Sequence, residues 1–444
     1  MIEWGPILLR IAGCWLYLMA RLCGYTDGVQ KESQRHVVII GGGVVGLCSA
    51  YYAMQEGWRV TVLEREERSE EGCSYGNAGM VVPSHFIPLA APGMIAKGMR
   101  WMLNPESPFY VKPRLSIDLM RWGIAFWRHA NEEHTERCKA LLAEMSLRSR
   151  RLFEELQEGA DFGLQKRGLL MLCKTQKALD GEAEVAAMAN ALGIKAEVCD
   201  RKRTAELDPG VEMDVQGSVW FEQDCHLEPN RFMEMLERKV EAGGGEIRYG
   251  AQVVGSEREG DKLKAVMLEG GEKVEADAVV VAAGAWSPDL ARIFGAQVLM
   301  QAGKGYSLTL PHPVQLPELC SIFTEAKVAI TPMGQALRFA GTMEVGGNDL
   351  SVNPRRVQGI IKSVKEYFPQ FDVSHFEGVD AWAGLRPCSP DGLPYIGKLS
   401  QYGNVVVATG HAMMGLSLGP VTGQMVADIL GGEGVDTRLA VERF

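Results

Sequence analysis

The sequence predicts an α/β protein that contains a parallel sheet with crossover helices. Two observations support this fold class. The apolar residues 37–40 lead directly into a glycine-rich turn and a helical pattern, which is typical of a buried parallel strand and its crossover helix. Strand patterns that end in glycine turns recur at residues 276–290 and 405–430.

The composition is that of an ordinary globular protein. The chain has 444 residues, of which 46% are hydrophobic and 23% are charged, and this length allows more than one core. A formal net charge of −10 lacks the broad positive field that nucleic acid requires, so we exclude that partner. None of the ten cysteines lies at CxxC spacing, which predicts neither a metal site nor a dithiol pair. Scattered reduced thiols are typical of a cytoplasmic compartment.

The first 35 residues differ from the rest of the chain. Residues 4–25 are almost wholly apolar and are long enough to cross a bilayer. A helix lying in the membrane interface fits at least as well, because several polar side chains share one helical stripe. The alternative is a mistaken start site, since the fold signals begin only at His36. We therefore expect an N-terminal apolar helix and linker over residues 1–35, with membrane attachment left open. The polar residues of the stripe are Glu3, Arg10, Tyr17 and Arg21.

The glycine-rich turn has the spacing of a dinucleotide-binding site. Gly41 permits the tight turn, Gly43 lets the backbone approach a pyrophosphate, and Gly46 lets the helix lie close to the strand. The phosphates would lie at the helix N-terminus, where backbone N–H groups are unpaired. Glu64 closes the second strand, residues 59–63, and can accept hydrogen bonds from ribose hydroxyls. A glycine-rich hairpin would not explain this acid.

Later segments favour a flavin over a nicotinamide cofactor. Residues 72–84 are rich in small side chains, as expected where backbone approaches a ligand. A helix that begins near residues 417–420 would direct its positive end at the loop before it. A reduced flavin carries negative charge that the positive end of this helix would stabilise, whereas a nicotinamide ring needs no such stabilisation. We therefore expect FAD as the cofactor. The expected contact residues are Gly41, Gly43, Val44, Val45, Gly46, Glu64, Arg65, Asn77, Ala78, Gly79, Met80, Ala283, Gly284, Gly410, Met414, Gly415, Leu416 and Ser417.

With these segments in order, the chain resembles the FAD-dependent D-amino acid oxidase superfamily, and most closely its bacterial D-amino acid dehydrogenase branch. The stretches that carry the resemblance are "VVIIGGGVVGLCSAYY", "SYGNAGMVVPSHFIPLAAPG", "KGYSLTL", "AGLRPCSPDGLPYIG" and "TGHAMMGLSLGPVTGQ". The resemblance implies hydride transfer from the α-carbon of a D-amino acid to flavin N5. The resulting imino acid would be hydrolysed to a 2-oxo acid and ammonia.

The resemblance also implies discontinuous domains. A Rossmann-like FAD-binding domain is expected over residues 36–83, 222–300 and 380–444. A mixed α+β substrate domain is expected over residues 84–221 and 301–379. The sequence agrees, because the stretches between the glycine motifs show helical apolar faces and short alternating strands instead.

Arg386 is the leading candidate for substrate binding. It lies in a stretch rich in proline and glycine, which we interpret as a loop, and the resemblance implies that it binds the substrate carboxylate. A guanidinium group suits that role, because it matches a carboxylate bidentately and stays charged when desolvated. The alternative is a surface arginine that pairs with Asp391.

Two further residues are candidates for the catalytic site. The hydroxyl of Tyr306 could share the carboxylate with Arg386, although a tyrosine on a strand is equally typical of a core residue. His411 lies in the loop placed over the flavin and could contact flavin or substrate, or could merely cap the following helix. Arg338 is expected to pair with Glu344 rather than with substrate.

No residue of the sequence identifies the electron acceptor. The apolar N-terminus favours a quinone or another acceptor other than oxygen. It also favours the cytoplasmic side of the inner membrane, with a peripheral or N-terminal attachment, and otherwise the cytoplasm. One alternative is an oxidase of the glycine or sarcosine type that uses oxygen. A second is a flavin-binding module without catalytic activity.

Overall fold

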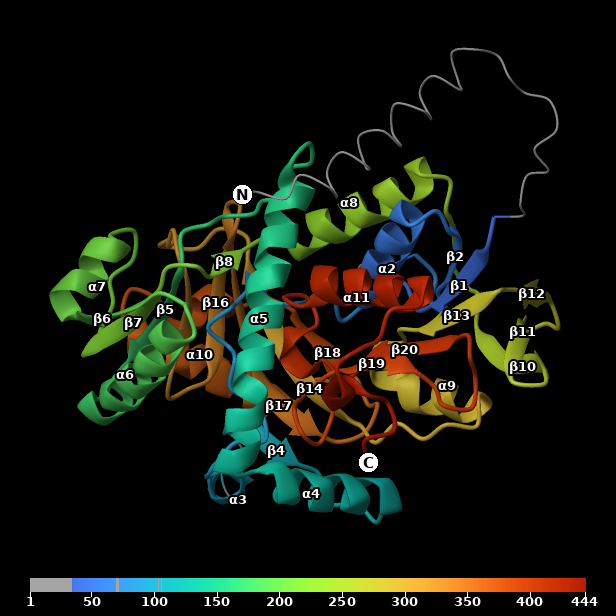
Figure 1. The fold of residues 1–444 in the computed structure, drawn as a ribbon. Coiled ribbons are helices and arrows are strands. Elements are labelled where there is room, and N and C mark those ends of the chain that lie inside the picture. The colour runs from blue at the N-terminus through green and yellow to red at the C-terminus, as the bar shows by residue number, and fades with distance from the viewer. Residues whose placement is uncertain (1–33, 69–71, 103, 105) are drawn as a thin grey trace, which may run out of the picture. The chain divides into compact units, whose positions relative to one another are not determined.

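We describe the fold from a computed structural model, which covers residues 34–68, 72–102, 104 and 106–444 (Figure 1). Residues 35–444 form one compact unit. The expected apolar helix falls almost entirely on residues 1–33, outside the described residues. Within the described part of the chain, no helix combines the length and apolar character needed to cross a membrane.

A six-stranded sheet carries the nucleotide-binding motif, in the order β19-β20-β13-β1-β2-β9. All of its pairs are parallel except that of β19 with β20. The central strand β1 is fully buried, which is why its sequence is a continuous apolar run instead of an alternating one. The strand bounds are β1 His36–Ile40, β2 Arg59–Leu63, β9 Glu246–Arg248, β13 Ala278–Val281, β19 Tyr395–Lys398 and β20 Val405–Thr409.

Helices α2 (Val44–Gln55), α8 (Pro229–Ala242) and α11 (Gly419–Gly431) lie together beside this sheet (Figure 1). Helices α2 and α11 pack closely, because a Cβ atom at Gly423 would lie 2.5 Å from the backbone of Cys48. Farther along the sheet lie α9 (Ser287–Ile293) and a three-stranded sheet. Its strands are β10 (Val253–Glu259), β11 (Lys262–Leu268) and β12 (Lys273–Glu275).

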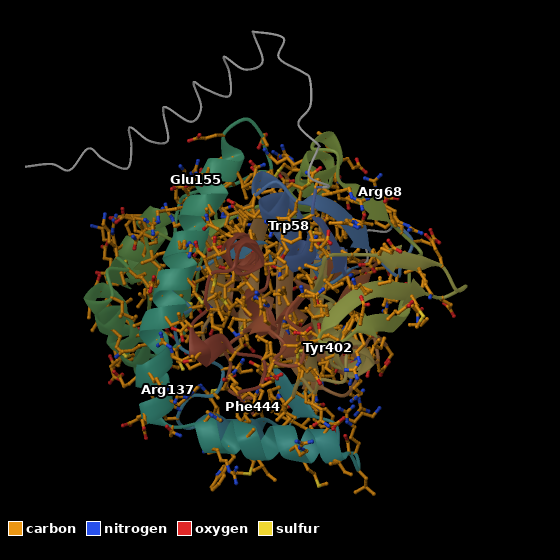
Figure 2. The ribbon with its side chains drawn as sticks, turned by 45° about the vertical axis from the view of Figure 1, so that its right-hand side comes forward. Trp58, Arg68, Arg137, Glu155, Tyr402 and Phe444 are labelled. Atoms are coloured by element: carbon orange, nitrogen blue, oxygen red, sulfur yellow. The ribbon has the colours of Figure 1, made fainter. Side chains whose placement is uncertain are left out.

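The long helix α5 (Glu132–Gln157) crosses the protein, with Arg137 near one end and Glu155 near the other (Figure 2). It is fixed to the region before α11, because the Ser149 hydroxyl donates to the Ser417 carbonyl at 2.6 Å. The Arg148 Nε atom donates to the Gln424 side chain at 2.8 Å.

A nine-stranded sheet forms the second half, in the order β18-β14-β17-β16-β15-β5-β7-β6, with β4 paired to β17. Helix α10 (Pro354–Tyr367) covers one face, where its apolar side chains share a core with Tyr306 and Phe339. The strands are β4 Phe109–Val111, β5 Leu169–Cys173, β6 Ala196–Asp200, β7 Gly217–Phe221, β14 Gln301–Leu310, β15 Cys320–Phe323, β16 Val328–Met333, β17 Ala336–Val345 and β18 Ala381–Cys388. The remaining elements are helices α3 Met94–Met102, α4 Ile117–His129, α6 Gln176–Ala191 and α7 Arg201–Leu207, and the paired strands β3 Met80–Val81 and β8 Cys225–His226.

The predicted fold class is confirmed, because a mainly parallel sheet and a mixed sheet are built from alternating parts of the chain. The exact domain boundaries stay a prediction, since residues 35–444 form a single compact unit. Strand β18 departs from the proposed division. It opens the segment 380–444, which we assigned to the nucleotide-binding domain, yet it pairs with β14 of the mixed sheet.

Candidate active site

A cavity of about 1100 Å³ is lined by residues from both sheets. One wall is formed by the turn between β1 and α2 and by the segment after β13. The other wall is formed by β14, β17 and β18 of the mixed sheet, and the loop before α11 completes it. The volume exceeds what a drug-sized ligand needs, which is about 300–1,000 Å³.

The turn after β1 can accept only glycine at two positions. Gly41 has a φ of +114°, and a Cβ atom there would lie 2.5 Å from the Ala282 carbonyl oxygen. A Cβ atom at Gly46 would lie 1.9 Å from the carbonyl oxygen of Gly41. Helix α2 therefore begins directly against the end of β1, and its N-terminus faces the cavity. This cradle fits the pyrophosphate of a dinucleotide.

Glu64 lies at the end of β2 and reaches back to this turn. Its Oε2 atom accepts a hydrogen bond from the Gly42 N–H at 2.7 Å. Next to it, the Arg65 guanidinium lies 4.0 Å from the ring centroid of Trp286. These side chains line the cavity together with Leu290. They fit the adenosine end of FAD, with the carboxylate available to the ribose hydroxyls.

Most of the predicted cofactor residues line the cavity. Those that do are Gly41, Gly43, Val44, Val45, Glu64, Arg65, Asn77, Ala78, Met80, Ala283, Gly284, Met414, Gly415 and Leu416. The four that do not are Gly46, Gly79, Gly410 and Ser417.

These four residues support the cavity wall from behind. Gly79 has a φ of +73°, and a Cβ atom there would lie 2.3 Å from the Leu227 carbonyl oxygen. Gly410 has a φ of +81° and lies against a buried tyrosine ring. The Ser417 hydroxyl accepts a hydrogen bond from the Val82 N–H at 3.0 Å. The sequence pattern identified segments that form the cavity but could not separate lining residues from supporting ones.

Arg386 lies on strand β18, which corrects the prediction of a loop. The strand tolerates Pro387 because β18 is at the edge of its sheet, where a missing N–H costs no ladder bond. In the register with β14, Arg386 lies opposite Gly303. Its guanidinium group lies over Gly305, where a Cβ atom would be 2.2 Å from Nη2. Gly305 therefore provides the space that Arg386 occupies.

A bulge in β17 provides a hydrogen-bond partner for Arg386. The pairing of β14 with β17 shifts between Lys304 and Tyr306, and Thr342 lies at this irregularity with a φ of +70°. Left-handed backbone is unusual for a β-branched residue. It places the Thr342 carbonyl oxygen where it accepts a hydrogen bond from Arg386 Nη1.

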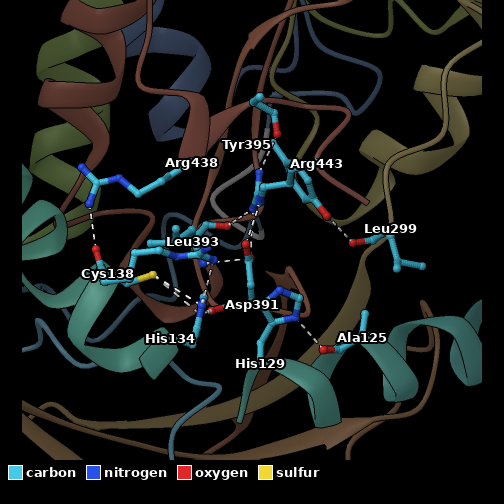
Figure 3. Close-up of polar contacts among 12 residues, drawn as sticks. Ala125, His129, His134, Cys138, Leu299, Asp391, Leu393, Tyr395, Arg438 and Arg443 are labelled. Carbon is cyan, nitrogen blue, oxygen red and sulfur yellow. Dashed lines mark hydrogen bonds and ion pairs between the residues drawn. The ribbon is translucent and has the colours of Figure 1, made fainter. Parts of the chain in front are cut away.

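Arg386 forms no ion pair with any carboxylate among the described residues. The surface alternative is wrong, because Asp391 accepts hydrogen bonds of 2.7 and 3.0 Å from Arg443 (Figure 3). Arg386 lines the cavity, and burial lowers its pKa from the ordinary value. A cation in this position lacks a counter-charge, which an anionic ligand would supply.

Tyr306 lines the cavity as Arg386 does, but its hydroxyl lies with Glu344, which argues against the prediction that the two share a carboxylate. Adjacent residues on a strand point to opposite faces, and Tyr306 pairs with Ala383, three residues from Arg386. Its hydroxyl donates to Glu344 and accepts a hydrogen bond from the Asn353 N–H at 3.2 Å. Glu344 also accepts a hydrogen bond of 2.9 Å from Arg356. The core interpretation of Tyr306 is therefore the correct one.

His411 lines the cavity but is almost fully buried. Its Nε2 atom lies 2.9 Å from the Thr422 hydroxyl of α11, and it makes no side-chain cap of the short helix that follows it. Burial lowers the pKa of His411 to about 3. The imidazole is therefore neutral at physiological pH, and it positions the loop against α11 whether or not it contacts the ligand.

Arg338 has a different partner from the one predicted. It donates from Nη1 to the carbonyl oxygens of Tyr75 and Asn77, at 3.0 and 2.7 Å, and not to Glu344. Burial lowers its pKa to about 10. Arg338 thus holds the segment 72–79 against the mixed sheet.

Sequence reasoning missed several residues of the site. The Ser74 hydroxyl accepts a hydrogen bond from the Val44 N–H at 3.0 Å, at the start of α2. The ring of Trp382 lies against Gly76 and Gly384, where Cβ atoms would be 2.2 and 1.9 Å away. The alternation of large and small residues in β18 was the available signal for Trp382. The missed residues that line the cavity are Gly42, Ser74, Trp286, Thr342 and Trp382.

No group of three or more acidic, histidine or cysteine side chains that could hold a metal ion is found among the described residues.

Replacing Glu64 with Ala should weaken FAD binding. The variant loses the acceptor for the ribose and the contact with the Gly42 N–H. Hydrogen bonds to a charged group are worth about 1.5–3 kcal/mol, so the dissociation constant should rise on the order of tenfold to a hundredfold. Absorbance at the flavin bands after dialysis measures occupancy. Glu64→Gln, which keeps one acceptor oxygen, should retain more flavin than Glu64→Ala. Full occupancy in both variants would contradict the placement of Glu64.

Comparison with known proteins identifies the family. Residues 36–429 match the family described as FAD dependent oxidoreductase (DAO). The chain is 33% identical over 404 residues to a D-amino acid dehydrogenase of Granulibacter bethesdensis, covering 89% of this chain and 96% of that protein. It is 28% identical over 398 residues to one from Helicobacter pylori, covering 89% and 95%.

Solved structures share the fold. The glycine oxidase of Geobacillus kaustophilus superposes with a TM-score of 0.73 at 22% identity, covering 93% of this chain and 100% of that one. An L-amino acid deaminase from Proteus myxofaciens superposes with a TM-score of 0.70 at 17% identity, covering 94% and 95%. The glycine cradle, the acid at the end of β2 and the large cavity agree with the family match. The chain therefore belongs to the DAO family of FAD-dependent oxidoreductases, and FAD is its cofactor.

Proposed function

We propose that this protein is an FAD-dependent D-amino acid dehydrogenase, which converts D-amino acids to 2-oxo acids and ammonia. Relatives with that name match 89% of the chain at 28–33% identity. The observation that carries the proposal is Arg386, a cation that lines the cavity without an acidic partner among the described residues. A substrate carboxylate would be its counter-charge. A flavin-binding module without activity would not need such a cation.

The residues of the cavity would orient the substrate. Arg386 would hold the carboxylate through its fork, while the Thr342 carbonyl fixes one guanidinium nitrogen and Gly305 leaves the space for it. Bound FAD supplies the acceptor for the hydride of the α-carbon. Because Tyr306 points to the opposite face, Arg386 is the side chain that we assign to the carboxylate.

No described side chain is required as a general base in this scheme. His411 stays neutral because burial lowers its pKa to about 3, so it adds no positive charge that would repel a substrate cation. The substrate amine must be neutral before hydride transfer, and its proton would go to water in the cavity or be lost before binding. Activity should therefore rise with pH as the neutral amine becomes more abundant.

The electrons would pass to a quinone or another acceptor other than oxygen. Support comes from the dehydrogenase names of the relatives and from the apolar residues 4–25. We propose that the protein acts at the cytoplasmic side of the inner membrane, where a quinone pool is available.

Arg386→Met should lower kcat/KM for D-alanine while flavin stays bound. Losing a charge-assisted contact costs about 1.5–3 kcal/mol, on the order of tenfold to a hundredfold. A D-amino acid amide lacks the carboxylate, so its kcat/KM should change much less. Gly305→Ala should reproduce the defect, because the new Cβ atom would displace the guanidinium. An equal loss for acid and amide would remove Arg386 from carboxylate binding.

Anaerobic D-alanine should bleach the yellow colour of the purified protein, and a quinone analogue should restore it. L-Alanine is the matched control, since a D-specific site should leave the flavin oxidised. Absorbance near the flavin bands follows both steps. Rapid peroxide formation in air, at a rate equal to quinone reduction, would favour the oxidase alternative instead.

Removing residues 1–34 should leave flavin content and dye-linked activity unchanged, because the first strand begins at His36. The truncated protein should shift toward the soluble fraction, and its activity with membrane quinone should fall as the local concentration of acceptor drops. Fractionation and a dye-linked assay measure the two effects. If the full-length protein is soluble without detergent, the N-terminal anchor is wrong.

A further inference from the structure

Helix α4 carries an apolar surface that nothing in the described structure covers. We define this outer face by Leu115, which lies just before α4, and by Ile117, Met120, Ile124 and Trp127 of the helix. All five side chains are more than half exposed, and Leu115 is fully so. Single exposed apolar residues need no explanation, but a contiguous group of large ones marks an interaction surface.

The sequence of α4 separates two apolar faces. Residues 117, 120, 124 and 127 recur at helical intervals on the outer side. On the inner side, Trp122 and Phe126 stack with ring centroids 5.1 Å apart, and Trp122 Nε1 donates to the Cys388 carbonyl at 2.9 Å. The inner face is therefore fixed to the mixed sheet. The outer face cannot also turn inward, and Figure 2 shows side chains along this helix that extend away from the protein.

The charges beside the outer face include several arginines, although Asp118 and, just after α4, Glu132 and Glu133 are also exposed. Arg121 and Arg128 are exposed on α4. Asp118, also on α4, forms a 3.2 Å ion pair with Arg292, which pairs with Asp289 as well. Helix α3, which lies in the same region of Figure 1, adds the exposed Met99 and Arg100. Apolar side chains flanked by arginines suit a surface of anionic lipid, because the cations reach the headgroups while the apolar groups enter the interface.

The size of the outer face argues against a second copy of the chain as its partner. Helix α4 has 13 residues, and a helix of that length is roughly 20 Å long and 10 Å wide. One side of it offers on the order of 200 Å², whereas a stable dimer buries about 800 Å² on each partner. A lipid surface needs no matching shape, and a single helix is enough for interfacial binding.

We propose that the outer face of α4 docks the body of the protein onto an anionic membrane surface. This contact is separate from the apolar N-terminal segment and supplies a second attachment. Two weak attachments on one chain bind far more tightly than either alone.

Helix α4 contacts a strand that contributes to the active site. The Trp122 hydrogen bond fastens α4 to β18, the strand that carries Arg386. On α3, Lys97 and Trp101 line the cavity while Met99 is exposed. Docking would therefore bring one wall of the cavity near the lipid, where a lipid-soluble acceptor enters. This last step rests on the proposed function, whereas the docking itself does not.

Vesicle sedimentation with the full-length, FAD-loaded protein tests the docking. The variant M120Q/W127Q removes two apolar side chains and keeps good helix formers. The matched control V198Q/V314Q removes exposed apolar side chains elsewhere, on β6 and in a loop. Vesicles contain phosphatidylcholine with phosphatidylglycerol, or phosphatidylcholine alone. M120Q/W127Q should partition onto the anionic vesicles on the order of tenfold more weakly than wild type, and the control should not.

Further readouts separate the competing outcomes. Wild-type binding should weaken at high salt and on neutral vesicles, because part of the attraction is electrostatic. Equal binding of M120Q/W127Q and wild type would overturn the proposal. A change in sedimentation coefficient without a change in vesicle binding would also overturn it and assign the face to a second copy. Flavin content and dye-linked activity check folding. Vesicle binding needs no turnover, so a failure of D-amino acid oxidation would not affect this test.

Discussion

The pairing of β18 with β14 is the constraint on which the candidate site depends. In this register Arg386 lies opposite Gly303, and its guanidinium group occupies the space over Gly305. The bulge at Thr342 then presents a carbonyl oxygen to the same group. A shift of one residue would turn every side chain of β18 to the opposite face. Arg386 would then point toward the core under α10 and away from the cavity.

Electrostatic pairing distinguishes Arg386 from several neighbouring cations. Lys304 and Arg356 lie close to Glu344 on the other face of the sheet, at 3.8 and 2.9 Å. Arg443 is paired with Asp391. Within the described residues, these neighbouring cations have acidic partners, whereas Arg386 has a carbonyl. Leaving a cation without a counter-charge at a cavity wall costs stability, which is tolerable when a ligand supplies the charge.

The cofactor side of the cavity depends on close backbone approach more than on charge. Gly41 and Gly46 bring the start of α2 against the end of β1, and Gly423 brings α11 against α2. The mixed sheet is held to this half by long-range contacts, such as Arg338 with the carbonyls of Tyr75 and Asn77. A long-range contact of the same kind connects helix α4 to the site, because the Trp122 indole donates a hydrogen bond to the backbone of β18.

The sequence by itself determined the strand and glycine turn of the nucleotide-binding sheet, Glu64 at the end of β2 and the start of α11, because these features are local in the chain. It also singled out Arg386, whose role in carboxylate binding stays a prediction. Only the tertiary structure decided that Arg386 is on an edge strand, that Tyr306 faces the other way and that Arg338 holds a backbone segment. Only the tertiary structure showed that Thr342 and Trp382 line the cavity. The physical reason is that each of these facts depends on which strands pair and in what register, and pairing between residues far apart in the chain leaves no local pattern.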